Sequence, residues 1–323
     1  MRYIRRKKRE EMIAVLMATY NGETYLREQL DSILSQTLQD IKIYIHDDGS
    51  KDATVDIVKE YTAVFPNRIF LVEGEPTGSG RMNFLYLLGK VEADYYMFSD
   101  QDDVWLPEKA EKCMEALSRM EREKGDIPLL TFSDMKVVNE DLSVIDNSFM
   151  YYNQLDPYHL TFNRLVVQNT AAGCTMLFNR RLRDEAVRYK KAEHIEHILA
   201  HDWWMILTAS ALGEVRYVDE PLSLYRQHSG NLVGAVKETG IKKKLKLVYW
   251  LVTFTHVKLT KERIEHFVLQ GQELAVLPLK GEPAKIVKGL RKFYDMNKIE
   301  RVRFVRRFKL FRNKRNLWQE ICL

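Results

Sequence analysis

Three aspartates stand close together at the end of a short apolar segment, in the stretch SDQDDVW that begins at Ser99. Asp100 and Asp102 form a DxD pair, and Asp103 follows directly. Carboxylates this close repel one another unless water, hydrogen bonds or a cation neutralises them. A DxD pair at a strand end offers two carboxylates to one hard divalent cation, and Mg²⁺ or Mn²⁺ held in this way takes further oxygens from substrate phosphates. The stretch therefore predicts a metal site that carries a diphosphate substrate.

A simpler interpretation is that these aspartates cap the helix expected to open at Pro107, because negative charge suits a helix N-terminus. One aspartate would be enough for that purpose, so we interpret Asp100 and Asp102 as metal ligands. Asp103 remains open to both roles, as a cap or as support behind the metal ligands.

Short apolar runs and helical patterns alternate through the first two-thirds of the chain and would position this site. Runs rich in Val, Ile, Tyr and Phe predict buried strands, and they cover residues 13–20, 41–48, 68–74 and 94–100. Segments with helical apolar spacing lie between the first and second runs and between the second and third. Two consecutive βαβ units imply a parallel sheet with right-handed crossovers. Strand-like runs after residue 125 predict that the second half adds a mixed sheet.

The first, second and fourth of these runs end in polar residues, in the motifs ATYNG, HDDGS and SDQDD. Ligands of open parallel sheets bind outside the carboxyl ends of the strands, so we expect these three motifs to share one site. No GxGxxG follows the first strand and no GxxxxGK[ST] occurs, which argues against a dinucleotide-binding dehydrogenase and a P-loop NTPase.

Composition excludes several classes of protein. Hydrophobic residues make up 46% of the chain and aromatic residues 11%, which is enough for a packed core and excludes global disorder. The three cysteines lie far apart without a CxxC pair, which argues against a disulfide framework and fits a reducing cytosol. We see no secretory signal, and the longest late apolar stretch, residues 245–259, is shorter than the roughly 20 residues that span a bilayer.

Taken in order, ATYNG, HDDGS, SDQDDVWLP and HDWW resemble the family 2 glycosyltransferases over about residues 12–235. The motifs GRMNF and YRQHSGN also fall where that family pattern expects them. In detail the chain is most similar to bacterial rhamnosyltransferases of cell-wall and capsular polysaccharide assembly. The resemblance implies an α/β protein with the GT-A fold, in which a Rossmann-like, mixed and mostly parallel sheet is flanked by helices.

The resemblance also implies roles for the residues that match it. Asp202 of HDWW would be the catalytic base, and Asp102, Asp100 and His228 would hold Mn²⁺ or Mg²⁺. Asp47 would accept a hydrogen bond from the pyrimidine N3–H, with Asp48 supporting its loop. The nucleotide-sugar pocket as a whole would be lined by Thr19, Tyr20, Asn21, Asp47, Asp48, Asn83, Asp100 and Gln101.

Two residues near the base are candidates for binding the acceptor. Trp203 could offer a stacking face to a sugar ring, although tryptophans in helices more often belong to the core. Asn169 lies in a loop where the acceptor is implied, with ordinary turn chemistry as the alternative.

Three histidines upstream of the base recur at helical spacing, a pattern that could suggest zinc. They lack the HExxH motif, so packed or solvent-facing side chains are the preferred interpretation. These residues are His194, His197 and His201.

The net charge of +5 is divided unevenly along the chain. Residues 241–323 contain 21 Lys and Arg against 7 Asp and Glu, so the remainder of the chain is net acidic. Basic helices with aromatic residues on one side suit an anionic membrane surface, where each Lys or Arg contributes about 1 kcal/mol. A solvated face and nucleic-acid binding are alternatives. We favour peripheral membrane association because the resemblance implies a lipid-linked acceptor.

These observations predict three segments: a basic N-terminal segment 1–11, a GT-A domain 12–240 and a basic amphipathic helical region 241–323. The expected activity is inverting, metal-dependent transfer of L-rhamnose from dTDP-rhamnose to a hydroxyl of a growing, lipid-linked cell-wall or capsular polysaccharide. It would take place in the cytoplasm, at the inner face of the cell membrane, without a nucleic-acid partner. The first alternative is the same chemistry with a UDP-hexose donor carrying Glc, Gal or GlcNAc. The second is a noncatalytic nucleotide-sugar or nucleic-acid binding module.

Overall fold

The computed structural model describes residues 12–228 and 255–311. The expected N-terminal segment 1–11, the boundary at residue 240 and part of the basic region lie outside the described residues.

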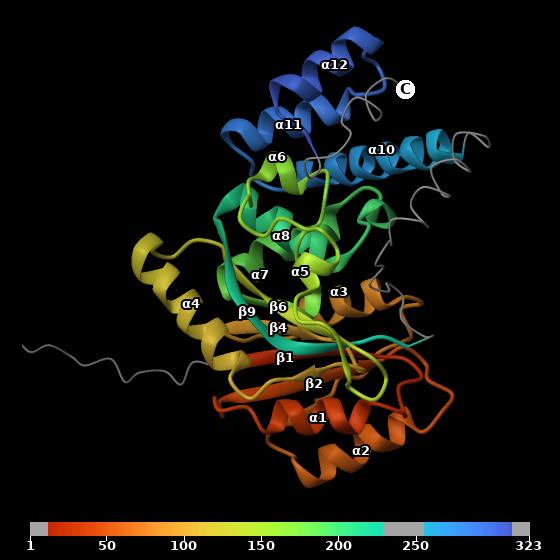
Figure 1. Ribbon diagram of the computed structural model, residues 1–323, viewed down its shortest axis with the longest axis vertical. Helices are drawn as coiled ribbons and strands as arrows, with labels where there is room; N and C mark the ends of the chain where they lie inside the picture. The colour runs from red at the N-terminus through yellow and green to blue at the C-terminus, as the bar shows by residue number, and fades with distance from the viewer. Residues whose placement is uncertain (1–11, 229–254, 312–323) are drawn as a thin grey trace, which may run out of the picture.

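A single mixed sheet forms the centre of the protein, with strand order β3-β2-β1-β4-β8-β6-β9-β5 and β7 paired to β6 (Figure 1). Its first four strands are parallel and form the two predicted βαβ units. They are β1 (Ile13–Thr19), β2 (Ile41–Asp47), β3 (Ile69–Leu71) and β4 (Tyr95–Ser99). The predicted mixed second half is confirmed, because β8 runs antiparallel to β4 and β6 while β9 runs parallel to β6. Its strands are β5 (Val104–Trp105), β6 (Leu129–Val138), β7 (Val144–Asp146), β8 (Met176–Asn179) and β9 (Glu214–Arg226).

Helices cover both faces of the sheet, which explains why the strand at its centre is an unbroken apolar run. In β1, Ile13, Val15 and Met17 belong to one core, and Ala14 and Leu16 belong to the other. The first core includes side chains of α1 (Leu26–Leu34), α2 (Thr54–Val64) and α4 (Lys109–Lys124). The second core includes side chains of α3 (Gly80–Lys90), α7 (Arg180–Ala186) and α8 (His201–Leu212). Strands buried on both faces need apolar residues at every position, not at alternate ones.

The described part of the basic region forms a helical layer beyond α8 (Figure 1). It contains α10 (Thr255–Glu273), α11 (Gly281–Arg291) and α12 (Lys298–Arg307), and the short helices α5 (Phe149–Tyr152) and α6 (Phe162–Leu165) come before α8 in the chain. Val268, Ile286 and Phe304 from this layer belong to the same core as Trp204 and Met205 of α8. The layer and the central sheet therefore share one hydrophobic core.

Four short 3₁₀ turns complete the described elements: η1 (Gly173–Thr175), η2 (Val187–Lys191), η3 (Ile195–His197) and η4 (Leu274–Val276). Across residues 12–228 and 255–311, no helix combines the length and the hydropathy needed to cross a bilayer.

Candidate active site

The carboxyl ends of β1, β2 and β4 meet at one edge of the sheet, as the three motifs predict. Thr19 at the end of β1 pairs with Asp47 at the end of β2, and Met17 pairs with Ser99 of β4. Residues that follow these strands are therefore neighbours in space although they are far apart in the sequence.

The loop after β1 is joined to the loop after β4 by the side-chain amide of Gln101. Its Oε1 accepts from the backbone N–H of Tyr20 at 2.9 Å, and its Nε2 donates to the carbonyl oxygen of Tyr20 at 2.9 Å. A Cβ at Gly22 would lie 2.3 Å from Gln101 Oε1, so any larger residue there would have to push this amide aside. The side chain of Tyr20 is 55% exposed. The exposed aromatic ring thus stands on a loop whose backbone is fixed.

Asp47 organises the loop after β2 with both of its carboxylate oxygens. Oδ1 accepts from the N–H groups of Gly49 and Ser50 at 3.0 and 2.8 Å, and Oδ2 accepts from Thr19 Oγ1 at 2.9 Å. Asn21, with φ of 48°, donates its N–H to Ser50 Oγ at 2.8 Å. These bonds hold the first two motifs together as one surface.

Asp48 and Asn83 lie against the neighbouring loop and helix. Asp48 Oδ1 accepts from Thr77 Oγ1 at 2.9 Å and from the Gly78 N–H at 3.1 Å, which anchors the loop before α3. Asn83 is 1% exposed, and its amide pairs with His46 through Oδ1 to Nδ1 and through Nδ2 to the His46 carbonyl oxygen, both at 2.9 Å. Asn83 therefore supports the carboxyl end of β2 through His46, from a buried position.

The acidic cluster Asp100, Asp102 and Asp103 lies at the end of β4, and it does not cap a helix. β5 separates the cluster from α4, which begins at Lys109. Asp102 Oδ2 lies 2.8 Å from Nε2 of His228, so two of the expected metal ligands are brought into direct contact. Asp103 is 1% exposed and accepts from the Arg226 N–H through Oδ1, while its buried Oδ2 has no hydrogen-bond partner in the described part of the chain.

Burial and mutual repulsion shift the titration of this cluster. The pKa of Asp100 rises to about 7, first because it is buried and then because Asp102 and Asp202 carry like charges. The pKa of Asp103 is raised well above its usual range by burial and by Asp102 and Asp100. Carboxylates in this condition gain most from a cation. The donor set of carboxylate oxygens with one imidazole, together with the orphaned Asp103 oxygen, fits Mn²⁺ or Mg²⁺.

A buried lysine beneath the cluster was missed by the sequence reasoning. Lys109 is fully buried, its Nζ donates to the carbonyl oxygen of Cys174 at 2.5 Å, and it lies 4.0 Å from the ring centre of Trp105. Burial lowers the pKa of Lys109, and the charges of Asp103 and Asp100 oppose that shift. Nothing in the sequence distinguishes this lysine from a solvated one at the start of a helix.

Arg226 was also missed, although it stands two residues before His228 in the YRQH motif. Arg226 is 2% exposed, and its Nε donates to the carbonyl oxygen of Asp102 at 2.9 Å. Its guanidinium lies 4.5 Å from the ring centre of Tyr25 and pairs with the carboxylate of Glu28. Arg226 thereby joins the loop that follows β4 to α1 and β9.

Asp202 stands in the first turn of α8, and its carboxylate is held from several directions. Oδ1 accepts from the Trp203 N–H at 2.6 Å, Oδ2 accepts from the Gly173 N–H at 3.2 Å, and the Asn169 side chain is a further hydrogen-bond partner. Burial nevertheless raises the pKa of Asp202 to about 6. A fixed carboxylate with a pKa near neutrality has the properties of a general base.

Of the aromatic residues around the base, Trp203 hydrogen-bonds a neighbouring helix and His201 packs in the core. Trp203 is partly buried, and its Nε1 donates to the carbonyl oxygen of Leu165 at 2.7 Å. His201 stacks on Phe84 with a centroid distance of 4.0 Å, and burial lowers its pKa to about 3, so it is a packed neutral histidine. His194 and His197 lie at η3 and not on α8, so the helical spacing assumed for the three histidines was wrong.

Comparisons with known proteins agree with this geometry. The family model described as "Glycosyl transferase family 2" matches residues 14–182. The dTDP-rhamnosyl transferase RfbG of Shigella flexneri is 28% identical over 242 residues, which cover 68% of this chain and 74% of that protein. An uncharacterized glycosyltransferase of Nostoc sp. is 25% identical over 231 residues, covering 68% of this chain and 66% of the relative. The crystal structure of S. aureus TarS 1-349 in complex with UDP-GlcNAc is similar in fold, with a TM-score of 0.54, 15% identity, and coverage of 89% of this chain and 74% of that chain.

Proposed function

The chain belongs to glycosyl transferase family 2 and is a glycosyltransferase, and on that premise we propose that it transfers L-rhamnose from dTDP-rhamnose to a saccharide hydroxyl with inversion. The observation that carries the reaction type is the pairing of one fixed base, Asp202, with a buried acidic cluster whose carboxylates repel one another. The rhamnose donor is supported by the likeness to RfbG of Shigella flexneri.

Asp202 would act on the acceptor. A hydroxyl is a poor nucleophile until a base within hydrogen-bond reach takes its proton, which contributes about 10²–10⁴-fold. The N–H groups of Gly173 and Trp203 hold the carboxylate in place, so only the acceptor has to be oriented. One base opposite the leaving group gives in-line displacement with inversion, and no second nucleophilic carboxylate is required.

The donor would lie across the loops that follow β1, β2 and β4. Thr19, Asn21 and Asp47 belong to one hydrogen-bonded platform for the nucleotide, in which Thr19 is buried and the neighbouring Tyr20 is exposed. Asp100, Asp102 and His228 would hold Mn²⁺ or Mg²⁺. When bound, the divalent ion neutralises the negative charge that grows on the departing diphosphate.

The acceptor would be presented from a membrane surface. A groove of about 530 Å³ lies along α11, with an apolar floor that includes Leu277 and Val287 and a rim that includes Lys288, Arg291 and Lys292. An apolar floor with a cationic rim suits an anionic lipid, whose phosphate would meet the rim while its chain enters the groove. We therefore infer peripheral association with the inner face of the cell membrane and a lipid-linked saccharide acceptor.

We further infer that residues 1–11, 12–240 and 241–323 differ in task, with catalysis in the second segment and surface attachment in the other two. The net positive charge of the last segment supports this division. Asn169, close to the base, and Trp203, next to it in sequence, remain the candidates for contact with the acceptor sugar.

Thermal stabilisation of the purified protein by nucleotide sugars tests the donor. dTDP-rhamnose, UDP-glucose, UDP-galactose and UDP-GlcNAc are each added with and without Mn²⁺, since a ligand that binds only the native state raises Tm, and raises it more the further its concentration exceeds its Kd. The proposal is supported if dTDP-rhamnose is the one sugar of the four that stabilises the protein, if this stabilisation requires Mn²⁺, and if the protein then turns over that donor. If only a UDP-sugar stabilises the protein, the donor is that UDP-sugar and not dTDP-rhamnose, and the proposed mechanism is unchanged.

A further inference from the structure

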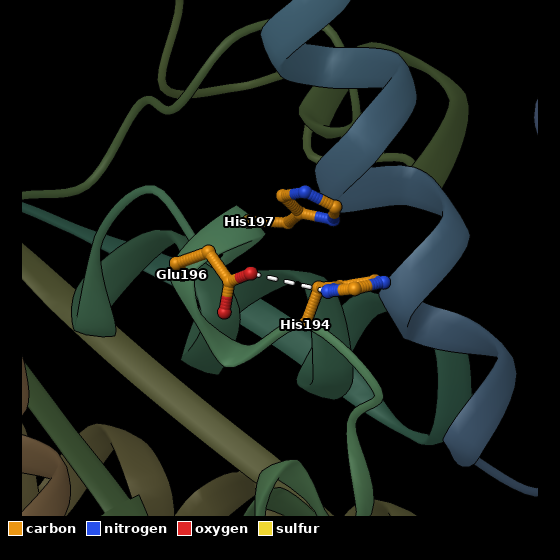
Figure 2. Close-up of side chains that lie close together, drawn as sticks. All are labelled: His194, Glu196 and His197. Atoms are coloured by element: carbon orange, nitrogen blue, oxygen red, sulfur yellow. Dashed lines mark hydrogen bonds and ion pairs between the residues drawn. The ribbon is translucent and has the colours of Figure 1, made fainter.

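A second group of possible metal ligands lies at η3, separate from the acidic cluster. His194, Glu196 and His197 each offer one ligand atom, and these atoms all lie within 4.8 Å of one another. Figure 2 shows the three side chains gathered beside α10. The sequence alone favoured packed or solvent-facing histidines here, because the HExxH motif is absent. The short distances between these side chains indicate instead that they could bind one metal ion.

The distances within this group suit a small transition-metal ion. His194 Nδ1 and Glu196 Oε1 are 3.1 Å apart. Two ligands bonded to one tetrahedral zinc at roughly 2.0–2.1 Å stand about 3.3 Å from each other. The ring centres of His194 and His197 are 4.8 Å apart. Side chains that are partly or largely exposed can make the remaining adjustment without moving the core.

Glu273 at the end of α10 provides an independent indication. Its carboxylate is 7% exposed, and Oε1 lies 3.1 Å from His197 Nδ1. Its other oxygen accepts from the His194 N–H at 3.3 Å. A carboxylate on one ring nitrogen fixes the tautomer and leaves the other nitrogen for a metal, which is the usual arrangement around metal-binding histidines. A largely buried carboxylate used in this way orients the site from behind.

We propose that His194, Glu196 and His197 form a zinc site, oriented by Glu273, that fastens α10 to the segment leading into α8. Two imidazoles and a carboxylate favour Zn²⁺ over Mg²⁺ or Ca²⁺, which prefer oxygen ligands. The fourth position would be left to water. Leu199 in the same segment already donates its N–H to Gln270 Oε1 of α10 at 2.8 Å. Through the contact between Glu273 and His197, the ion would reinforce this connection only a few residues before Asp202.

The test uses the full chain carrying Asp102→Asn, which removes a ligand of the catalytic metal site. The protein is stripped with a chelator and titrated with Zn²⁺ by calorimetry and with Co²⁺ by visible absorption. We expect one equivalent of either ion to bind. His194→Ala and His197→Ala should weaken binding by well over tenfold, and Glu273→Gln should weaken it by about 10–100-fold.

His159→Ala is the matched control, because His159 is also an exposed histidine paired with a carboxylate, at 2.7 Å from Asp156. The His159→Ala variant should bind Zn²⁺ with the same affinity as the parent. The His194 side chain is 52% exposed, so its replacement leaves the fold intact. Zn²⁺ should also slow amide hydrogen exchange in α10 of the parent and not in His194→Ala. Equal binding by the parent, His194→Ala and His197→Ala would overturn the site, and so would an equal loss in His159→Ala.

Discussion

Replacing Asp202 by asparagine tests the proposed base most directly. The side chain keeps its size and one oxygen acceptor but can no longer take a proton. Transfer should therefore slow by about 10²–10⁴-fold, which is the usual contribution of general base catalysis. Donor binding should persist, because Asp202 belongs neither to the proposed metal ligands nor to the nucleotide loops.

The raised pKa of Asp202 also sets the pH dependence of the wild-type enzyme. As the proposed base, Asp202 would act only when deprotonated, and its pKa of about 6 compares with an ordinary value of 3.8. The rate should be flat above about pH 7 and fall tenfold per unit below pH 6, leaving about one tenth at pH 5. With an ordinary aspartate, about nine-tenths of the groups would still be active at pH 5.

The assay is the initial rate of sugar transfer from pH 5 to pH 8, with donor, acceptor and Mn²⁺ saturating at every pH. Saturating Mn²⁺ keeps protons from displacing the metal at the acidic cluster, so the change of rate with pH reports the protonation of Asp202. Donor binding by Asp202→Asn is followed by calorimetry in the same buffers. A rate that stays level down to pH 5, or an Asp202→Asn variant with near wild-type turnover, would refute the assignment.

Three further substitutions test the surroundings of the site. Asp102→Asn should abolish the Mn²⁺-dependent part of donor stabilisation in a thermal shift assay, and an unchanged metal response would remove Asp102 from the metal site. Lys109→Met should cost about 1–3 kcal/mol in urea unfolding because it leaves the buried carbonyl oxygen of Cys174 without its donor. Lys112→Met on the same helix should cost at most about 1 kcal/mol, and equal losses in the two variants would contradict the role given to burial. Gly22→Ala should displace Gln101 from its two hydrogen bonds with Tyr20 and lower the free energy of unfolding by about 1–2 kcal/mol. It should also weaken donor binding in a calorimetric titration. Wild-type stability and wild-type donor affinity would show that the link between the loops after β1 and β4 is unimportant.

The parallel half of the sheet was predictable because its signals are local. The apolar runs around β1, β2 and β4 are uninterrupted, and the polar motifs that follow them had to meet at one edge once the crossovers were right-handed. The contact between Asp102 and His228, 126 positions apart, followed from the family pattern and not from spacing.

The supporting residues were not predictable, because their roles depend on burial and on distant partners. Lys109 acquires its role from the carbonyl of Cys174 and the ring of Trp105, neither of which its own segment identifies. Asn83 was expected to line the pocket, whereas its amide is taken up by His46. The three histidines were assigned to one helix because nothing in the sequence marks the boundary between η3 and α8.

The core shared by α8 and the C-terminal helices has a consequence for how the protein is made. Trp204 and Met205 of α8 belong to the same core as Val268 and Phe304, which lie some sixty and a hundred residues further on. During synthesis, this shared core therefore stays incomplete until the residues of α12 have left the ribosome, and exposed apolar surface on a nascent chain invites aggregation and chaperone capture. A chain released before that point would retain every motif of the catalytic edge and still fail to complete its core.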